Sequence, residues 1–246
     1  MNIGPIDALF GAEVTGMDLR RSLRDATPTA TNAAFVENGV LVFRDQNYSG
    51  PDQFLAAASN LGAPMPPVVA TYRLAGYDAI EELTNSAADK RTGENMPLYR
   101  GGSWHTDHSN LECPPKATTL YAIELPPSGG GNTEFTNMMM AYDALDYPLK
   151  ESLRGRLAFQ AYLSRRAPRK LLARSEAEEK GSEGVWQPMV RQHPKTGRAA
   201  LYLNPKCCDA VEGMGEAEGD ALLDVLYRHC DRLNFSTAIA GQRAIC

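Results

Sequence analysis

The sequence predicts one α+β domain with a mainly β core and flanking helices. Helix and strand patterns alternate in the first third of the chain, whereas strand patterns dominate from about Pro97 onward. An amphipathic helix follows near the C-terminus. We find no internal repeat and no linker in the 246 residues, and a chain of this length can bury one large core. We therefore treat residues 1–246 as a single domain.

The N-terminal region is predicted to run from strand to helix to strand. Residues 11–16 predict a short strand that ends in a turn. A helix is expected from near Pro28 to Glu37, because the Asn38-Gly39 pair that follows is a C-terminal stop signal. Residues 40–43 are four consecutive apolar β-formers, which is typical of a buried strand.

The middle of the chain is predicted to hold two helical regions with a strand between them. Ser49 is the expected N-cap of a helix that ends at Gly62. Residues 118–123 (TTLYAI) are rich in β-formers and predict a strand. Residues 141–153 predict a helical stretch that Pro148 splits into two short pieces.

The last third of the chain is predicted to contain a charged loop, a strand and a helix. Residues 164–184 are densely charged, which favours a solvated insertion or mobile loop. Residues 199–203 predict a strand that follows a turn at 194–197. A helix is expected over residues 216–233. Its apolar face is predicted to hold Leu222, Leu226, Cys230 and Leu233.

The composition excludes several classes of partner. The net charge of −5 leaves no basic footprint for a nucleic acid. No apolar run approaches the roughly 20 residues that a membrane-spanning helix needs. The N-terminus lacks the basic start and apolar core of a signal peptide. We therefore expect a cytoplasmic protein that binds neither membrane nor nucleic acid.

The five cysteines are interpreted as reduced thiols. They stand at positions 113, 207, 208, 230 and 246 and form no C-x-x-C pair. A structural zinc site built from Cys207, Cys208 and Cys230 is the alternative. It is disfavoured because adjacent cysteines bind one metal poorly compared with the usual spacing of two to four residues.

The most informative motif is His105-x-Asp107. A spacing of two places an imidazole and a carboxylate on the same side of an extended strand or of its terminal loop. From there both can bind one octahedral metal ion as two ligands of a 2-His-1-carboxylate triad, the site type of non-haem iron(II) oxygenases. The third ligand of such a triad has to come from a histidine later in the chain.

Five stretches in order along the chain resemble the TauD/TfdA family, the taurine and aryloxyalkanoate dioxygenases that use iron(II) and 2-oxoglutarate. These stretches are residues 11–19, 39–44, 104–107, 130–135 and 193–204. The resemblance covers most of the chain and is expected to fade after Phe235.

The resemblance implies a fold, a site and a reaction. The fold is a double-stranded β-helix, or jelly roll, with flanking helices. His105 and Asp107 match the family's iron ligands, and Thr133 matches the residue that hydrogen-bonds the 2-oxoglutarate carboxylate farthest from the metal. The implied reaction is hydroxylation of a small, anionic organic substrate by O2. Halogenation is disfavoured because Asp107 is a carboxylate and not a small residue. A dimer or tetramer is also expected from the family.

Each site residue has a simpler alternative interpretation. His105 can be a buried histidine whose tautomer is set by a hydrogen bond to Asp107. Thr133 can be only a turn residue after two glycines, and Trp104 is expected to serve packing. The substrate is expected to be chosen by residues 66–100. Candidates to line its pocket are Tyr72, Arg73, Asn85 and Arg100.

The other three histidines are not expected to bind iron. His108 follows the motif and is expected at the substrate pocket or the surface. His193 precedes a proline in a predicted surface turn. His229 lies near the end of the last helix, where a cation is favoured by the helix dipole.

The chain departs from the family after Phe235. The tail contains no histidine, and it shows no strand pattern. Its one basic residue, Arg243, does not align with the family arginine that pairs with the 2-oxoglutarate carboxylate. We hypothesise a C-terminally truncated or frameshifted member that lacks its last strands. Two functions therefore stay open: an active dioxygenase, and an impaired relative retained as a binding module or as a damaged gene product.

Overall fold

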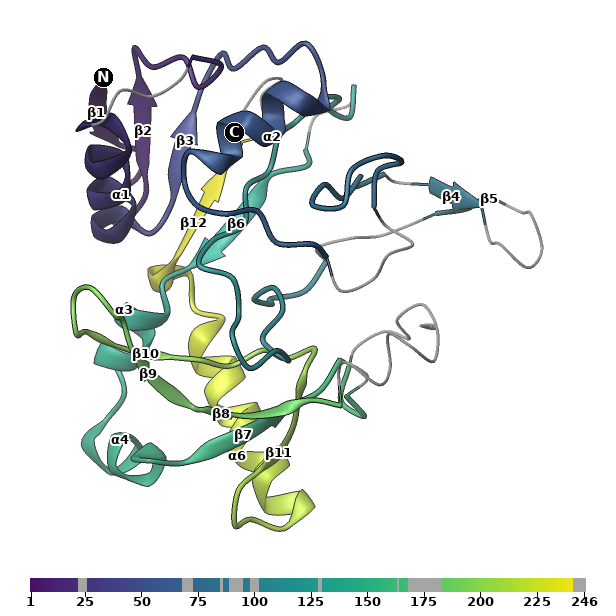
Figure 1. The fold of residues 1–246 in the computed structure, drawn as a ribbon. Helices are drawn as coiled ribbons and strands as arrows, with labels where there is room; N and C mark the ends of the chain where they lie inside the picture. The colour runs from purple at the N-terminus through teal and green to yellow at the C-terminus, as the bar shows by residue number, and fades with distance from the viewer. Residues whose placement is uncertain are drawn as a thin grey trace.

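A computed structural model describes residues 1–21, 26–67, 73–84, 86–88, 95–97, 102–127, 130–162, 164–167 and 183–240. Helices and strands are mixed through these residues, which agrees with the predicted α+β class (Figure 1). The strands form five sheets of two or three strands each. The jelly roll as such stays a prediction.

The N-terminal sheet has the order β1-β2-β3. Strand β2 (Ala12–Thr15) pairs antiparallel with β1 (Asn2–Pro5) and parallel with β3 (Leu41–Phe43). Helix α1 (Ala26–Asn38) connects the parallel strands and lies beside the sheet (Figure 1). It ends as predicted, because Gly39 takes a φ of 73° that favours glycine.

Helix α2 (Pro51–Ser59) packs on a small core that it shares with strands β2 and β3. The helix is not capped as predicted. Its N-cap is Gly50, and Ser49 supplies no side-chain cap. The backbone N–H of Ser49 instead donates to Oε1 of Gln53, so the glutamine side chain provides a hydrogen-bond acceptor for the backbone just before the helix. The buried residues of this core are Val14, Leu19, Phe43 and Ala57.

Two further sheets form the C-terminal half of the molecule. Strand β7 (Leu157–Gln160) is central and pairs antiparallel with β8 (Val185–Pro188) and β11 (Cys208–Val211). The predicted turn and strand near residue 199 form a hairpin of β9 (Val190–Gln192) and β10 (Ala199–Leu201). These strands bury their inner faces against the C-terminal helices in the larger core.

Two short helices replace one long one, as Pro148 predicted. Helix α3 (Met138–Asp143) is capped by the Asn137 side chain, and α4 (Tyr147–Leu153) by Asp146. Pro148 stands in the first turn of α4, where it needs no hydrogen-bond donor.

The apolar face of helix α6 (Glu216–Cys230) differs from the predicted one. Leu226 and Cys230 are buried as expected, but Leu223 is fully buried where Leu222 is only partly so. Leu233 is 89% exposed, because the helix ends at Cys230 and a 3-10 turn η2 (Leu233–Phe235) redirects the chain.

The prediction that the tail forms no strand is wrong. Strand β12 (Ser236–Ile239) pairs antiparallel with β6 (Thr133–Thr136), and the two lie between the N-terminal sheet and the C-terminal half (Figure 1). Thr237 and Ile239 are buried in alternation with exposed neighbours. Because most residues of this tail are small or polar, the sequence shows no clear alternation of apolar and polar residues. The alternation of burial that is typical of a strand becomes visible only in the pairing with β6. The remaining pair is β4 (Ser86–Ala88) with β5 (Asn95–Pro97).

The strand predicted over residues 118–123 does not form. No described strand pairs with this segment, so its backbone stays outside the sheets. Ile123 is 69% exposed as a result. Tyr121 nevertheless fixes the segment, since its ring lies 4.7 Å from that of Tyr48 and 5.7 Å from that of Phe54, centroid to centroid.

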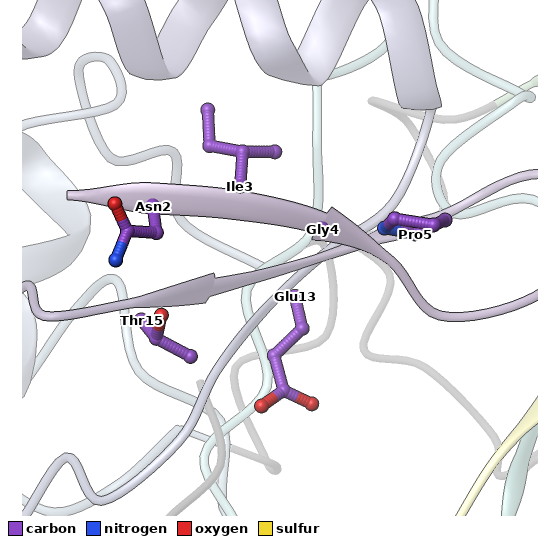
Figure 2. Close-up of a pocket in the computed structure, with 6 residues that line it drawn as sticks. All are labelled: Asn2, Ile3, Gly4, Pro5, Glu13 and Thr15. Atoms are coloured by element: carbon purple, nitrogen blue, oxygen red, sulfur yellow. The ribbon is translucent and has the colours of Figure 1, made fainter.

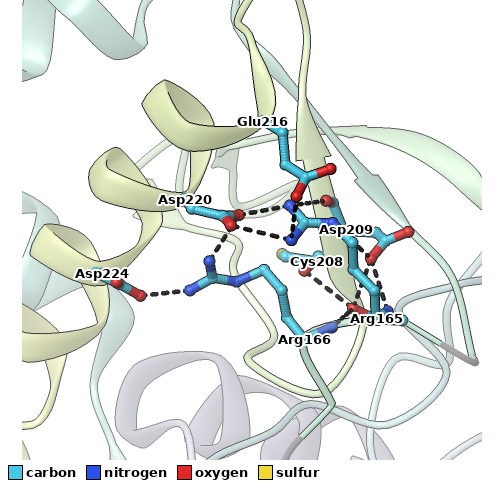
Figure 3. Close-up of polar contacts among 8 residues, drawn as sticks. Arg165, Arg166, Cys208, Asp209, Glu216, Asp220 and Asp224 are labelled. Atoms are coloured by element: carbon cyan, nitrogen blue, oxygen red, sulfur yellow. Dashed lines mark hydrogen bonds and ion pairs between the residues drawn. The ribbon is translucent and has the colours of Figure 1, made fainter.

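The start of the charged segment 164–184 is partly buried and bound to α6, although Arg165 itself is exposed. Ser164 is 7% exposed, and Arg165 binds Asp220 of α6 through both terminal nitrogens, at 2.6 and 3.0 Å (Figure 3). Arg166 contacts Asp220 and Asp224, one turn apart on the same helix. We call the four charged residues just named, together with Asp209 and Glu216, the ionic cluster. Residues 168–182 lie outside the described residues.

Candidate metal centre

The loop that carries His105 and Asp107 is held by one buried amide. Asn204, three residues beyond β10, is 2% exposed. Its Nδ2 donates to the carbonyl of Thr106 and to Oγ of Ser109, both at 2.8 Å. Its Oδ1 accepts the N–H of Lys206. Both hydrogens of the amide are therefore engaged, and the residue between His105 and Asp107 is tied to the C-terminal sheets.

The imidazole of His105 is oriented by its own loop. Nδ1 lies 2.8 Å from the carbonyl oxygen of Ser103, and because a carbonyl only accepts, Nδ1 carries the proton. In the neutral ring Nε2 then holds the lone pair. Histidines that bind metals commonly donate their second N–H to a backbone carbonyl in this way.

The carboxylate of Asp107 lies opposite that lone pair. Its Oδ1 is 3.6 Å from His105 Nε2, and its Oδ2 accepts a hydrogen bond of 2.6 Å from Oγ1 of Thr118. A separation of 3.6 Å is too long for a hydrogen bond between the two side chains. The His105 side chain is 34% exposed. The alternative interpretation, a buried histidine bonded to Asp107, is therefore wrong.

The donor atoms fit two ligands of one ion. Two neighbouring ligands on an octahedral ion, each about 2.1 Å from it, lie roughly 3 Å apart. The distance of 3.6 Å between Nε2 and Oδ1 needs only a small closure to reach this. Within the described residues, no group of three His, Cys, Asp or Glu side chains could hold a metal. The described residues thus offer two donor side chains, His105 and Asp107, for the expected triad.

Trp104 and Thr133 flank this loop in different ways. The Trp104 indole N–H donates to Oδ1 of Asp231, the C-cap of α6, at 2.6 Å. The packing role predicted for Trp104 thus includes a polar contact between the loop and α6. Thr133 is the exposed first residue of β6, opposite Ile239 of β12. Its role toward 2-oxoglutarate stays a prediction.

Two of the other histidines, His229 and His193, have hydrogen-bond partners through their side chains. His229 is buried and its Nε2 donates to the carbonyl of Ala141, so it joins α6 to α3 and does not act as a surface cation. His193 Nδ1 accepts the N–H groups of Lys195 and Thr196 in the predicted turn. His108 has a φ of 53°, because the chain turns at residues 107–110 and is not extended there.

Of the predicted pocket residues, the structure describes only Arg73. Its Nη2 donates to the carbonyl of Pro67 at 3.1 Å, and its Nη1 lies 3.7 Å from Asp78, which indicates a bracing role. Tyr72, Asn85 and Arg100 lie outside the described residues, as does Arg243.

Two hollows mark the described surface. One lies on the β1–β2 face, where Asn2, Glu13 and Thr15 point to one side of the sheet and Ile3 to the other (Figure 2). It contains none of the predicted site residues. The second, smaller hollow is lined by Trp104, Glu134, Asp231 and residues of η2 and β12. It therefore adjoins the loop that carries His105 and Asp107.

The described cysteines are free, as predicted. Cys113 is exposed, whereas Cys207, Cys208 and Cys230 are buried. Burial raises the pKa of the Cys208 thiol to about 11 and that of Cys230 to about 12. Without a bound metal, such thiols stay protonated near neutral pH.

The model of the family described as taurine catabolism dioxygenase TauD, TfdA family, matches residues 2–243. The chain belongs to this family. The match continues past Phe235, so the expectation that similarity fades there is wrong. The hypothesis of a truncated or frameshifted member stays a prediction. Within the described residues, no helix is long and apolar enough to cross a membrane.

Individual relatives of this TauD/TfdA protein are α-ketoglutarate-dependent dioxygenases. The 2,4-dichlorophenoxyacetate dioxygenase of Cupriavidus pinatubonensis, which is α-ketoglutarate-dependent, is 31% identical over 239 residues, or 94% of this chain and 82% of the relative. An α-ketoglutarate-dependent sulfate ester dioxygenase of Pseudomonas putida is 30% identical over 240 residues, or 95% and 75% of the two chains.

Two solved structures share the fold. A taurine dioxygenase from Burkholderia xenovorans superposes with a TM-score of 0.79 at 26% identity, over 99% of this chain and 77% of that one. AAD-2 in complex with Mn(II) and N-oxalylglycine gives a TM-score of 0.77 at 26% identity, over 100% and 85% of the two chains. Family membership thus implies 2-oxoglutarate as co-substrate and iron(II) as metal.

Sequence reasoning missed the residues that support the ligands. Thr118 was assigned to a strand, and Asn204 was noted only as part of a motif. A polar residue that directly follows an apolar strand run was the available signal for Asn204. The sequence carries no such signal for Ser103 or Asp231. Ser103 contacts His105 through its backbone carbonyl in a loop, and Asp231 accepts the Trp104 indole N–H at the end of a helix.

Proposed function

We propose that this chain is an iron(II)- and 2-oxoglutarate-dependent dioxygenase that hydroxylates a small, anionic organic molecule. The observation that carries the proposal is the pair of donor atoms Nε2 of His105 and Oδ1 of Asp107. They face each other at 3.6 Å while the second polar atom of each side chain is already hydrogen-bonded. Oxygen and imidazole ligands of this kind suit iron(II).

The site residues have separate roles in this proposal. His105 and Asp107 bind the metal ion, and the Asp107 carboxylate offsets part of its charge. Thr133 binds the distal carboxylate of 2-oxoglutarate. When bound, iron(II) supplies the redox chemistry by which O2 oxidises both the keto acid and the substrate. The chain itself keeps the ligand atoms oriented through the contacts of Ser103, Thr118 and Asn204.

The substrate class rests on the relatives. They are named for 2,4-dichlorophenoxyacetate, (S)-phenoxypropionate and sulfate esters. All three substrate types carry an anionic group on a small organic body. We extend this chemistry to the present chain.

The test is turnover of 2-oxoglutarate to succinate in the presence of iron(II), O2 and a panel of aryloxyalkanoates, sulfonates and sulfate esters. We expect one of these classes to stimulate succinate formation, and we expect His105→Ala to abolish it. Absence of succinate from folded, iron-loaded protein with every class would contradict the proposal.

An impaired relative that serves as a binding module is the second candidate. It is favoured by the engagement of His229 and His193 elsewhere, which leaves two ligands in the described site. Iron(II) stands low in the order of metal affinities, so two ligands hold it weakly. This candidate predicts that the protein binds 2-oxoglutarate or substrate, measured by calorimetry, without forming succinate.

The same proposal includes the jelly-roll fold, a homo-oligomeric state and a cytoplasmic location. The jelly roll is supported by the likeness to the taurine dioxygenase structure. Homo-oligomerisation and a cytoplasmic location follow from the family and the composition. Small-angle scattering of the purified chain would measure its oligomeric state.

A further inference from the structure

The two oxygens of the Asp107 carboxylate have different surroundings. Oδ2 accepts the hydroxyl of Thr118 at 2.6 Å, within the length range of hydrogen bonds from a hydroxyl to an ionised carboxylate. Oδ1 instead faces Nε2 of His105 at 3.6 Å. One oxygen is thus engaged by the protein, and the other is directed to the position where both ligand atoms converge.

We propose that Thr118 is a positioning residue that makes Asp107 a one-oxygen ligand. Its hydroxyl holds Oδ2, so that Oδ1 alone is presented to the metal together with Nε2 of His105. This inference rests on the proposed metal site and goes beyond it, because it assigns the binding atom and the residue that selects it.

The need for such a residue follows from the freedom of the side chain. The torsion that turns an aspartate carboxylate is broad, so both oxygens can rotate into a site unless one is held. The Asp107 side chain is 40% exposed, and packing therefore restrains it little. Among the described residues, Thr118 supplies the hydrogen bond that this carboxylate accepts.

The position of Thr118 makes the restraint independent of the ligand loop. It lies in segment 118–123, which the aromatic contacts of Tyr121 fasten to Tyr48 and Phe54. The hydroxyl therefore reaches Asp107 from outside the turn that begins at that residue. Thr119, the next residue, has the same side chain and provides a matched control.

The experiment measures Mn(II) binding by the loss of the free-ion EPR signal, with 2-oxoglutarate present. Thr118→Val keeps the shape of the side chain but removes the donor. We expect its dissociation constant for Mn(II) to rise about tenfold, since changes to residues that orient a metal ligand cost 10- to 100-fold in affinity. Thr118→Ser keeps the hydroxyl and is expected to stay within about threefold of the unaltered protein. Thr119→Val is expected to bind as the unaltered protein does.

Each outcome separates this inference from the proposed function. Thr118→Val that binds Mn(II) as the unaltered protein does, while folded by circular dichroism, overturns the role of Thr118 and leaves the metal site standing. An equal loss in Thr119→Val also overturns it, because the loss then belongs to the segment and not to the hydroxyl. Failure of Asp107→Ala to weaken binding overturns the metal site and the inference together.

Discussion

The His105–Asp107 loop and the ionic cluster on α6 are both groups of polar side chains, but they use their polar atoms differently. In the ionic cluster, Arg165 and Arg166 each lie 2.6 Å from the carboxylate of Asp220, and Arg166 also contacts Asp224 (Figure 3). In the loop, His105 and Asp107 lie 3.6 Å apart and are each held by an uncharged group. Charges that neutralise one another join chain segments, whereas donor atoms held apart with lone pairs available can bind a ligand.

The sharpest way to break this comparison is to remove a donor atom from the loop. His105→Ala and Asp107→Ala should each raise the dissociation constant for Mn(II), measured by equilibrium dialysis, by more than about 100-fold, because a direct ligand counts for more than its supporting residue. Both side chains are partly exposed, so the free energy of unfolding should change by less than about 0.5 kcal/mol. Retained metal binding in either variant would remove the basis of the comparison.

Removal of the buried amide should affect stability and binding together. Asn204→Ala leaves the carbonyl of Thr106 and the hydroxyl of Ser109 without their donor. We expect the free energy of unfolding, from urea titration, to fall by about 2 kcal/mol. Asn60→Ala is the control, because that amide is only partly buried and makes a single long hydrogen bond of 3.3 Å, to the carbonyl of Ala56, so the free energy of unfolding should change by less than about 0.5 kcal/mol. Equal effects of the two substitutions would show that Asn204 does not anchor the loop.

The contact between Trp104 and α6 should matter less. Trp104→Phe keeps an aromatic ring but removes the N–H that donates to Asp231. The contact lies at a partly exposed position, so we expect a loss of roughly 1 kcal/mol in the free energy of unfolding. Asp231→Asn retains an acceptor and should lose less. A larger loss in Asp231→Asn than in Trp104→Phe would contradict this assignment.

The ionic cluster should respond to pH and not to metal. Hydrogen bonding from Arg165 lowers the pKa of Asp220 below its usual 3.8. A carboxyl group with a lowered folded-state pKa contributes stability above pH 3.8 that is lost as the pH falls through the folded-state value. Asp220→Asn should therefore flatten the fall in melting temperature below about pH 4, while Mn(II) affinity at pH 7 stays unchanged. Weaker Mn(II) binding in this variant would mean that the two regions are coupled.

The sequence predicted the elements whose signals are local. Gly39 ended α1 and Pro148 divided the helical stretch before α4, and the spacing of His105 and Asp107 predicted that their side chains lie close together. Contacts between distant segments were not predictable in this way. Ser236–Ile239 became a strand only through its pairing with β6, and residues 118–123 stayed unpaired because no described strand lies alongside. Whether a segment forms a strand thus depends more on an available partner strand than on the β-propensity of its own residues.

The same limit applies to the residues around the site. Thr118 lies 11 residues from Asp107, and Asn204 lies 98 residues from Thr106, yet both hold the ligand loop. Their roles depend on how the segments fold together. A spacing rule proposes the ligands, and only three-dimensional contacts show which residues orient their side chains.

We propose that His105 and Asp107 bind iron(II) together with 2-oxoglutarate. The decisive measurement is an anaerobic titration of the protein with iron(II) in the presence of 2-oxoglutarate, in which the weak visible charge-transfer band of the chelate is followed. We predict a saturable band in the unaltered protein and its loss in His105→Ala. No band from folded, unaltered protein would contradict the claim and would leave dioxygenase as a description of the family and not of this chain.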